Sequence, residues 1–84
     1  MTLPSQPVTL TAQELADLRS KLSDTRHEIN GQLALIGGAV ELMRLKPQTA
    51  ERMLATLGEQ PAKISKTLDN FIGEFDRAVG ISRA

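Results

Sequence analysis

The stretch LADLRSKLSDTRHEINGQLALIGGAVELM, residues 15–43, decides the fold of this 84-residue chain. Its apolar and small residues recur at alternating steps of three and four, the heptad spacing of a helix that packs along one seam. The seam consists of Leu15, Leu18, Leu22, Thr25, Ile29, Gln32, Ile36, Ala39 and Met43. In its second half the apolar face widens by four more residues, Leu33, Leu35, Val40 and Leu42. Such a wide face packs against more than one neighbour, as in a four-helix bundle.

Signals at both ends set the limits of this first helix. Thr11 followed by Glu14 is a capping-box pattern, so we expect the helix to begin there. Residues 1–10 contain two prolines and little periodicity, and they are predicted to form a flexible N-terminal tail. The pair Lys46-Pro47 marks the far end, because the residue before a proline avoids helical dihedrals.

A second seam follows Pro47 and predicts a second helix that ends at Gly80. It consists of Ala50, Leu54, Leu57, Pro61, Ile64, Leu68, Phe71, Phe75 and Ala78. Pro61 lies on the seam itself, so we favour one helix that continues through Pro61 with a kink. Two separate helices broken at residues 58–61 are the alternative. Residues 81–84 are assigned to a C-terminal tail.

These patterns predict an all-α fold with one domain, an antiparallel two-helix hairpin over residues 11–80. Each helix has about 33 residues and a length of about 50 Å. A hairpin of this size buries a thin core on its own. We therefore expect a homodimer, in which two hairpins form a four-helix bundle.

The composition excludes several classes of function. Ten basic and ten acidic residues give no net positive charge, and two phenylalanines are the only aromatic residues, so a nucleic-acid partner is not expected. The chain has no cysteine and a single histidine, and we predict neither a metal site nor a cofactor. No apolar run approaches the length of a membrane span, and the start does not resemble a signal peptide. A cytoplasmic protein without a membrane partner is expected.

The single histidine, His27, is the first candidate for chemistry. With Leu22 and Ile29 at heptad position a, His27 falls at position f, the outermost position of the helix. One interpretation is an ordinary solvated surface residue. The other is a nucleophile, because an exposed imidazole suits reversible phosphoryl transfer from a second protein, and Glu28 lies beside it.

The residues around His27 resemble the phosphoacceptor box of a known family. They are Arg26-His27-Glu28-Ile29-Asn30-Gly31-Gln32-Leu33, then Ile36, Gly38 and Glu41-Leu42. The second helix contributes Gln60, Lys63-Ile64-Ser65 and Leu68-Asp69-Asn70-Phe71. Over residues 11–76 the chain resembles the dimerisation and histidine-phosphotransfer domain of two-component sensor histidine kinases.

This resemblance implies roles for individual residues. His27 is the implied phosphoacceptor and Glu28 the acid/base partner that helps the imidazole attack. Many family members place Thr or Asn four residues after the histidine to orient a hydrolytic water, whereas this chain has Gly31. Another branch uses Gln five residues after the histidine, and Gln32 fits that position. Gln32 also lies at heptad position d, where a buried polar residue sets the register, so both interpretations stay open.

Two further residues are candidate neighbours of the phosphoryl group. Asn30 belongs to the box, and the hairpin is expected to bring Lys66 of the second helix roughly level with His27. The basic residues Lys63, Lys66 and Arg77 have two interpretations: a cluster that favours the acidic surface of a receiver domain, or a plain solvated face that includes nearby acidic residues. The second is favoured.

The predicted function is therefore a histidine-phosphotransfer or response-regulator-binding module of a two-component system. Its partners would be a receiver domain and a sensor histidine kinase. Nothing in the chain resembles the ATP-binding domain of a kinase, so no ATP-dependent autokinase activity is expected. The alternative is a non-catalytic dimeric helical module that binds or inhibits a kinase or response regulator. A plain coiled-coil adaptor is a third interpretation.

Overall fold

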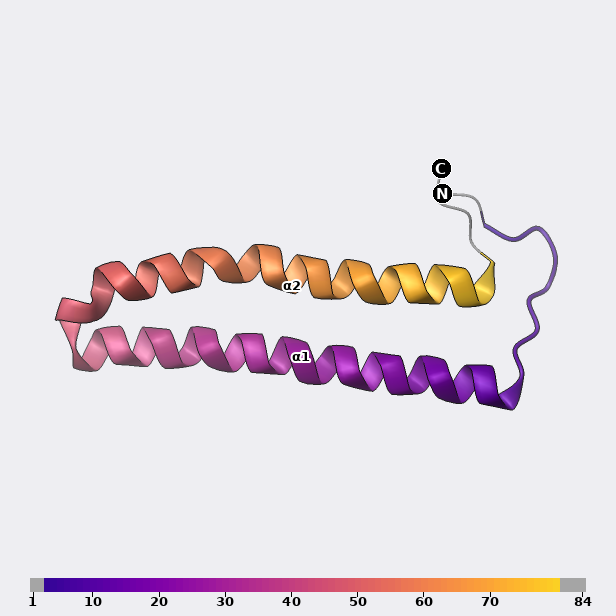
Figure 1. Cartoon of the computed structure of the whole chain (residues 1–84), viewed down its shortest axis with the longest axis horizontal. Coiled ribbons are helices and arrows are strands. Elements are labelled where there is room, and N and C mark those ends of the chain that lie inside the picture. The colour runs from indigo at the N-terminus through magenta and orange to yellow at the C-terminus, as the bar shows by residue number, and fades with distance from the viewer. Residues whose placement is uncertain (1–2, 81–84) are drawn as a thin grey trace.

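The computed structural model describes residues 3–80 as an antiparallel hairpin of two long helices (Figure 1). Helix α1 spans Ala12–Leu45, a 3-10 turn spans Pro47–Thr49, and helix α2 spans Ala50–Val79. The molecule measures 58 × 28 × 11 Å and contains no strand within the described range. The predicted all-α hairpin is confirmed, whereas the C-terminal tail at 81–84 lies outside the described residues.

The predicted capping box starts α1. The Glu14 backbone N–H donates to the Thr11 hydroxyl oxygen at 3.0 Å, and the Thr11 N–H donates to the Glu14 carboxylate at 3.1 Å. Two of the N–H groups that a helix start leaves free are thereby satisfied. Residues 3–10 precede this cap outside either helix and are almost entirely exposed.

The chain reverses at the predicted break. The Lys46 backbone has φ −134° and ψ 81°, which leaves the helical region, and its N–H still donates to the Leu42 carbonyl at 2.8 Å. Pro47 then occupies the first position of the 3-10 turn, where its missing N–H has no cost. The Thr49 N–H and hydroxyl both donate to the Lys46 carbonyl, at 2.9 and 2.7 Å, and close the turn.

Helix α2 runs without interruption through Pro61, so the favoured prediction of one continuous helix is confirmed. Its ribbon bends gently in the stretch coloured orange (Figure 1), as expected where proline removes one backbone hydrogen bond. Gly80 ends the helix in the left-handed conformation with φ +76°, and its N–H donates to the Asp76 carbonyl. Glycine adopts this conformation without the steric cost that other residues incur.

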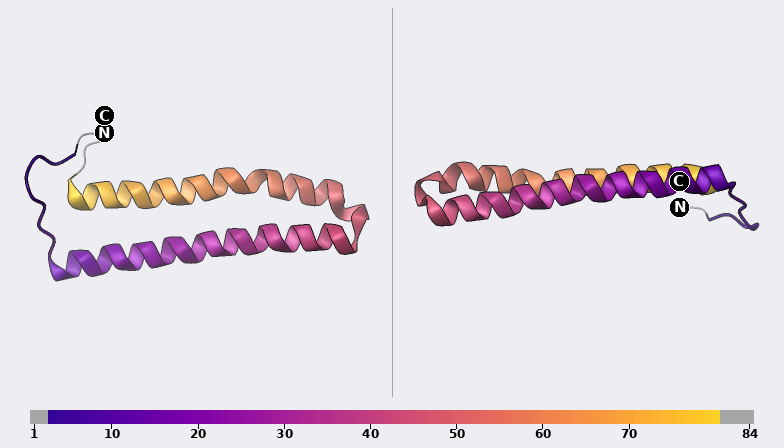
Figure 2. Two further views of the ribbon diagram at one scale, coloured as in Figure 1. Left: turned by 180° about the vertical axis from the view of Figure 1, so that it is seen from behind. Right: turned by 90° about the horizontal axis from the view of Figure 1, so that it is seen from below.

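The two helices lie side by side along the hairpin, as the left view of Figure 2 shows, and they overlap in the view from below. On α1 the predicted seam residues from Leu18 onward are buried or half-buried, with the exception of the exposed Leu22. On α2, however, the buried positions Gln60 and Thr67 lie one step away from the predicted seam residues Pro61 and Leu68, which are exposed. Helix α2 is therefore turned so that only part of its apolar stripe contacts α1.

This rotation leaves a wide apolar surface uncovered. Among residues 3–80, Ala39 is the only buried hydrophobic residue, at 4% exposure. Eight exposed large apolar residues define what we call the open apolar face: Leu15, Leu22, Leu33, Val40, Leu54, Leu68, Ile72 and Phe75. A single hairpin therefore has almost no hydrophobic core of its own.

Within the described range, neither helix carries an apolar stretch of the length that a membrane crossing requires.

Candidate functional site

His27 stands on the outer side of α1, near the middle of the hairpin. Its side chain is exposed and makes no hydrogen bond or ion pair with any other residue in the range 3–80. The residues of α1 that face α2, such as Ile29 and Gln32, are half-buried and lie on the other side of the helix. The imidazole is thus open to an approaching partner.

The neighbours of His27 on α1 are also exposed. Glu28 is the next residue, so its side chain leaves the helix about 100° around from that of His27. Asn30 lies three positions after His27, on nearly the same face of the next turn. The position four residues after the histidine is Gly31, which adds no side chain and leaves the surface there open.

Gln32 does not share this face, because its side chain lies in the seam between the helices. Its amide nitrogen donates to the Thr67 hydroxyl at 3.1 Å, and that hydroxyl donates to the Lys63 carbonyl at 3.0 Å. The Gln32 Oε1 atom is buried and has no hydrogen-bond partner among the described residues. This placement matches a polar residue that sets the register of the hairpin, while its role in orienting a hydrolytic water stays a prediction.

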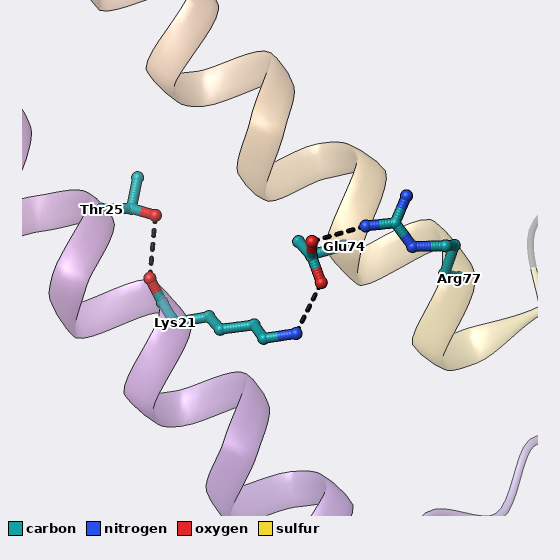
Figure 3. Close-up of polar contacts among 4 residues, drawn as sticks. All are labelled: Lys21, Thr25, Glu74 and Arg77. Carbon is teal, nitrogen blue, oxygen red and sulfur yellow. Dashed lines mark hydrogen bonds and ion pairs between the residues drawn. The ribbon is translucent and has the colours of Figure 1, made fainter.

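Two polar contacts between the helices lie on either side of His27 along α1, and they show which residues of α2 lie at the same height as His27. One is Gln32–Thr67. The other, toward the open end of the hairpin, is the ion pair of Lys21 with Glu74 (Figure 3). His27 is therefore level with residues 68–72. Lys66 lies about one turn closer to the turn of the hairpin, is exposed, and makes no hydrogen bond or ion pair within residues 3–80.

Glu74 joins the two helices through both carboxylate oxygens. Oε2 accepts from the Lys21 ammonium of α1 at 2.5 Å, and Oε1 accepts from the Arg77 guanidinium of α2 at 2.5 Å (Figure 3). The Lys21 carbonyl in turn accepts a 2.8 Å hydrogen bond from the Thr25 hydroxyl. The hydrogen bond from Lys21 and the charges of Arg77 and Lys21 hold the pKa of Glu74 below its usual 4.5, against the opposing effect of desolvation.

Glu74→Gln should make the thermal stability of the protein less sensitive to acid. Because the folded state lowers the pKa of Glu74, its ionised form stabilises the protein above the unfolded pKa of 4.5. This contribution disappears as the pH falls through the lower folded-state pKa. The Tm difference between the wild type and Glu74→Gln should therefore be largest near neutral pH and vanish in acid. Lys21→Met should give the same profile, and a pH-independent difference for both variants would contradict this origin.

Of two arginines near His27, Arg19 was not singled out from the sequence, and Arg26 was named only as the first residue of the phosphoacceptor box. Together with Leu22 and Ser23, Arg19 and Arg26 line a shallow hollow of 330 Å³ on the open-end side of the histidine. Neither guanidinium makes an ion pair within the part of the chain that the structure describes. The signal in the sequence is their spacing, because Arg19 and Arg26 continue the seven-residue interval of Leu33 and Val40.

An apolar groove of 320 Å³ lies on the other side of His27, toward the turn, where α1 and α2 meet. It is lined by Ala34, Leu35, Gly38, Ala39, Leu42, Met53 and Thr56. Ala34 is two turns along α1 from His27 on the same face, so the groove begins beneath the histidine. The small residues Ala34, Gly38 and Ala39 leave the groove open, so a partner's side chains can enter it.

No group of three or more histidine, cysteine, aspartate or glutamate residues within residues 3–80 is arranged to hold a metal ion. No family model, no curated protein and no solved structure matches the chain.

Proposed function

We propose that the chain is a histidine-phosphotransfer module of two-component signalling, in which His27 exchanges a phosphoryl group with an aspartate of a receiver domain. The observation that carries the proposal is the position of His27. The chain's one histidine is exposed on α1, opposite the seam with α2, in a segment that resembles the phosphoacceptor box. Transfer between two folded proteins needs such access.

The transfer starts from a ring nitrogen of His27 that carries a free lone pair. This nitrogen attacks the phosphorus of the aspartyl phosphate and forms a phosphorus–nitrogen bond. The phosphorus–oxygen bond breaks, and the aspartate leaves as a carboxylate. The proton on the other ring nitrogen is then more acidic, and Glu28 is the adjacent carboxylate proposed to accept it. Asn30 and Lys66 are proposed as neighbours of the phosphoryl group.

Two surfaces beside His27 support a protein partner. The apolar groove on the turn side offers contact area, and Arg19 in the hollow on the other side offers positive charge. A receiver domain presents its phosphorylated aspartate among acidic residues, so a basic surface next to the acceptor favours the encounter. A sensor histidine kinase as a further partner and a cytoplasmic location belong to the same proposal.

The proposed active form is a homodimer whose two hairpins make a four-helix bundle. The support is the open apolar face together with the single buried hydrophobic residue of the hairpin. Exposed apolar patches of this extent mark protein interfaces. In this bundle each His27 still lies on the outside, so both copies can receive a phosphoryl group.

His27→Ala should abolish phosphotransfer and leave binding intact. The test uses receiver domains from the source organism, phosphorylated with radiolabelled acetyl phosphate and mixed with each variant. We expect the wild type to gain label that is acid-labile and stable in base, as a phosphorus–nitrogen bond is, and His27→Ala to stay at background. Ser20→Ala is the matched control, because Ser20 is exposed two turns before His27 on the same face of α1, and it should retain the transfer.

The same experiment distinguishes phosphotransfer from the alternative function, a non-catalytic module that binds or inhibits a kinase or response regulator. The apolar groove supports this alternative, because a docking surface needs no reacting group. If the wild type and His27→Ala bind a receiver domain or a kinase equally and neither takes up label, the chain is a non-catalytic module that holds or inhibits its partner. If neither protein binds any receiver domain or kinase, two-component function is excluded and a plain helical adaptor is left.

A further inference from the structure

We infer that two charged edges fix how the second copy is aligned, with Arg26 and Arg44 of each chain paired with Asp69 and Glu51 of the other. The turns of both hairpins then lie at the same end of the bundle, and α1 of each chain packs against α2 of the other. This inference rests on the homodimer proposed above and specifies its geometry.

The open apolar face is one continuous side of the hairpin. At the open end, a wholly apolar groove of 370 Å³ has Leu15 and Leu22 of α1 on one wall and Phe71 and Phe75 of α2 on the other. The exposed stripes of both helices therefore look to the same side. Each stripe continues toward the turn. On α1, Leu33 follows Leu22 after eleven residues, three full turns, and Val40 follows after seven more; on α2 the stripe runs back from Phe75 to Leu68 and Leu54 at multiples of seven.

A second copy of the chain is the occupant that this face fits best. The face runs along the whole hairpin, so its partner must offer an apolar surface of equal length, and another copy does so by definition. With only Ala39 buried among its described apolar residues, the hairpin gains its core only from this partner. Such dependence is typical of an obligate homodimer, whose interface resembles a domain core cut in half.

The edges that border the open apolar face carry opposite charges on the two helices. On α1, Arg19 and Arg26 share the stripe of Leu33 and Val40, and Arg44 lies one turn after Val40. On α2, Glu51 lies one turn before Leu54 and Asp69 one turn before Ile72. The edge of α1 is thus basic and the edge of α2 is acidic.

Two symmetric arrangements can bury the face, and the charges distinguish them. If the twofold axis runs across the helices, α1 lies on α1 of the other copy, with the turns at opposite ends, and basic edge meets basic edge. If the axis runs along the helices, α1 lies on α2 of the other copy, with the turns together, and basic edge meets acidic edge. Like charges opposed at an interface are unfavourable, so the second arrangement is selected.

The contacts within one chain give the register of these pairs. The Lys21–Glu74 ion pair shows which residues of α1 and α2 are level. Counting from it along the antiparallel helices places Arg26 level with Asp69, and Arg44 level with Glu51. A twofold axis along the bundle preserves these levels between the two copies.

The charged groups are available for such contacts. Arg26, Asp69 and Glu51 make no ion pair within residues 3–80, and Arg44 contacts only Glu41 of its own helix, at 3.2 Å. Within one chain the two edges lie on either side of the open apolar face, so these groups meet only when a second copy fills it.

Charge reversal tests the arrangement by sedimentation equilibrium of the full chain. Arg26→Glu and Asp69→Arg should each weaken dimerisation about tenfold, because a symmetric dimer loses two attractive pairs and gains two repulsive ones. The double variant Arg26→Glu/Asp69→Arg should recover the wild-type Kd. Arg52→Glu, which reverses an exposed charge of α2 away from this edge, is the control and should change nothing.

A crosslink supplies a second measurement, since the chain has no cysteine to interfere. A Val40→Cys chain refolded together with a Leu54→Cys chain should form a covalent pair on oxidation. The arrangement is overturned if this crosslink does not form. It is also overturned if the double variant weakens dimerisation by the sum of the two single effects. Both results would leave the wild-type dimer in place. A wild-type mass of one chain, 9.1 kDa, would instead reject the proposed dimer itself.

Discussion

Leu68→Glu should dissociate the proposed dimer and unfold most of the hairpin. Leu68 is 45% exposed on the single chain and lies within the open apolar face of α2. In the dimer this position would be covered, so the variant buries an unpaired carboxylate in each copy and removes an apolar side chain. The first effect costs several kcal/mol per charge and the second about 2 kcal/mol. We expect Kd to rise at least about a thousandfold.

The measurement combines sedimentation equilibrium with circular dichroism at matched concentrations. The wild type should sediment at twice the chain mass of 9.1 kDa, and the variant at the mass of one chain with a reduced helical signal. Leu45→Glu is the matched control, because Leu45 is even more exposed, at 71%, and lies outside the open apolar face. A Leu68→Glu protein that sediments and folds as the wild type does would show that this face is not the interface.

Gln60→Leu should stabilise the protein, which is an uncommon result for a fully buried position. Gln60 is 1% exposed in the seam with α1, which makes it the least exposed residue in the range 3–80. Its amide nitrogen donates to the Thr56 carbonyl at 3.0 Å, but its Oε1 atom has no hydrogen-bond partner among the described residues. Leucine has a similar volume and removes this buried acceptor, so we expect a gain of about 1–2 kcal/mol in the free energy of unfolding.

Urea denaturation at one fixed protein concentration measures this gain, because the stability of a dimer depends on concentration. Gln60→Ala is the control, since it removes the same acceptor but leaves a cavity, and it should destabilise the protein. A Gln60→Leu protein less stable than the wild type would mean that Oε1 finds a hydrogen-bond partner in solution. The position would then contribute to stability as well as to register.

The local features of the fold followed from the sequence because each depends on a few neighbouring residues. Thr11 and Glu14 form the predicted capping box, the chain reverses at Lys46-Pro47, and Gly80 ends α2. The seven-residue periodicity likewise sufficed to predict two helices. Their antiparallel contact follows directly from a turn of three residues.

The face that α2 turns toward α1 could not be predicted in the same way. The apolar stripe of α2 is wider than one contact requires, so periodicity alone does not decide which half meets α1. The structure places the polar residues Gln60 and Thr67 in the seam and leaves Leu68 and Phe75 outside. Such a choice depends on packing along the whole hairpin and runs against the expectation that apolar residues are buried first.

For the candidate site, the sequence predicted which side chains are exposed, but it did not predict which residues of α1 and α2 contact each other. The outermost heptad position assigned to His27 agrees with its exposed side chain. The pairing of Gln32 with Thr67, however, depends on the relative rotation of the two helices, which the sequence did not provide. Arg19 passed unnoticed, and the charge of Arg26 received no role, because charged residues on a helix surface are common and only their place beside the open apolar face distinguishes these two.

Among residues 3–80 Ala39 alone is a buried hydrophobic residue, and this has a consequence for how the chain behaves at low concentration. If the core forms only where two chains meet, folding is a second-order process. The folding rate then depends on chain concentration, because a newly made chain folds only after it meets a second one. The midpoint of thermal unfolding then rises with protein concentration. The amount of folded dimer would then rise faster than linearly with the amount of chain made, so little folded protein would be present at low expression.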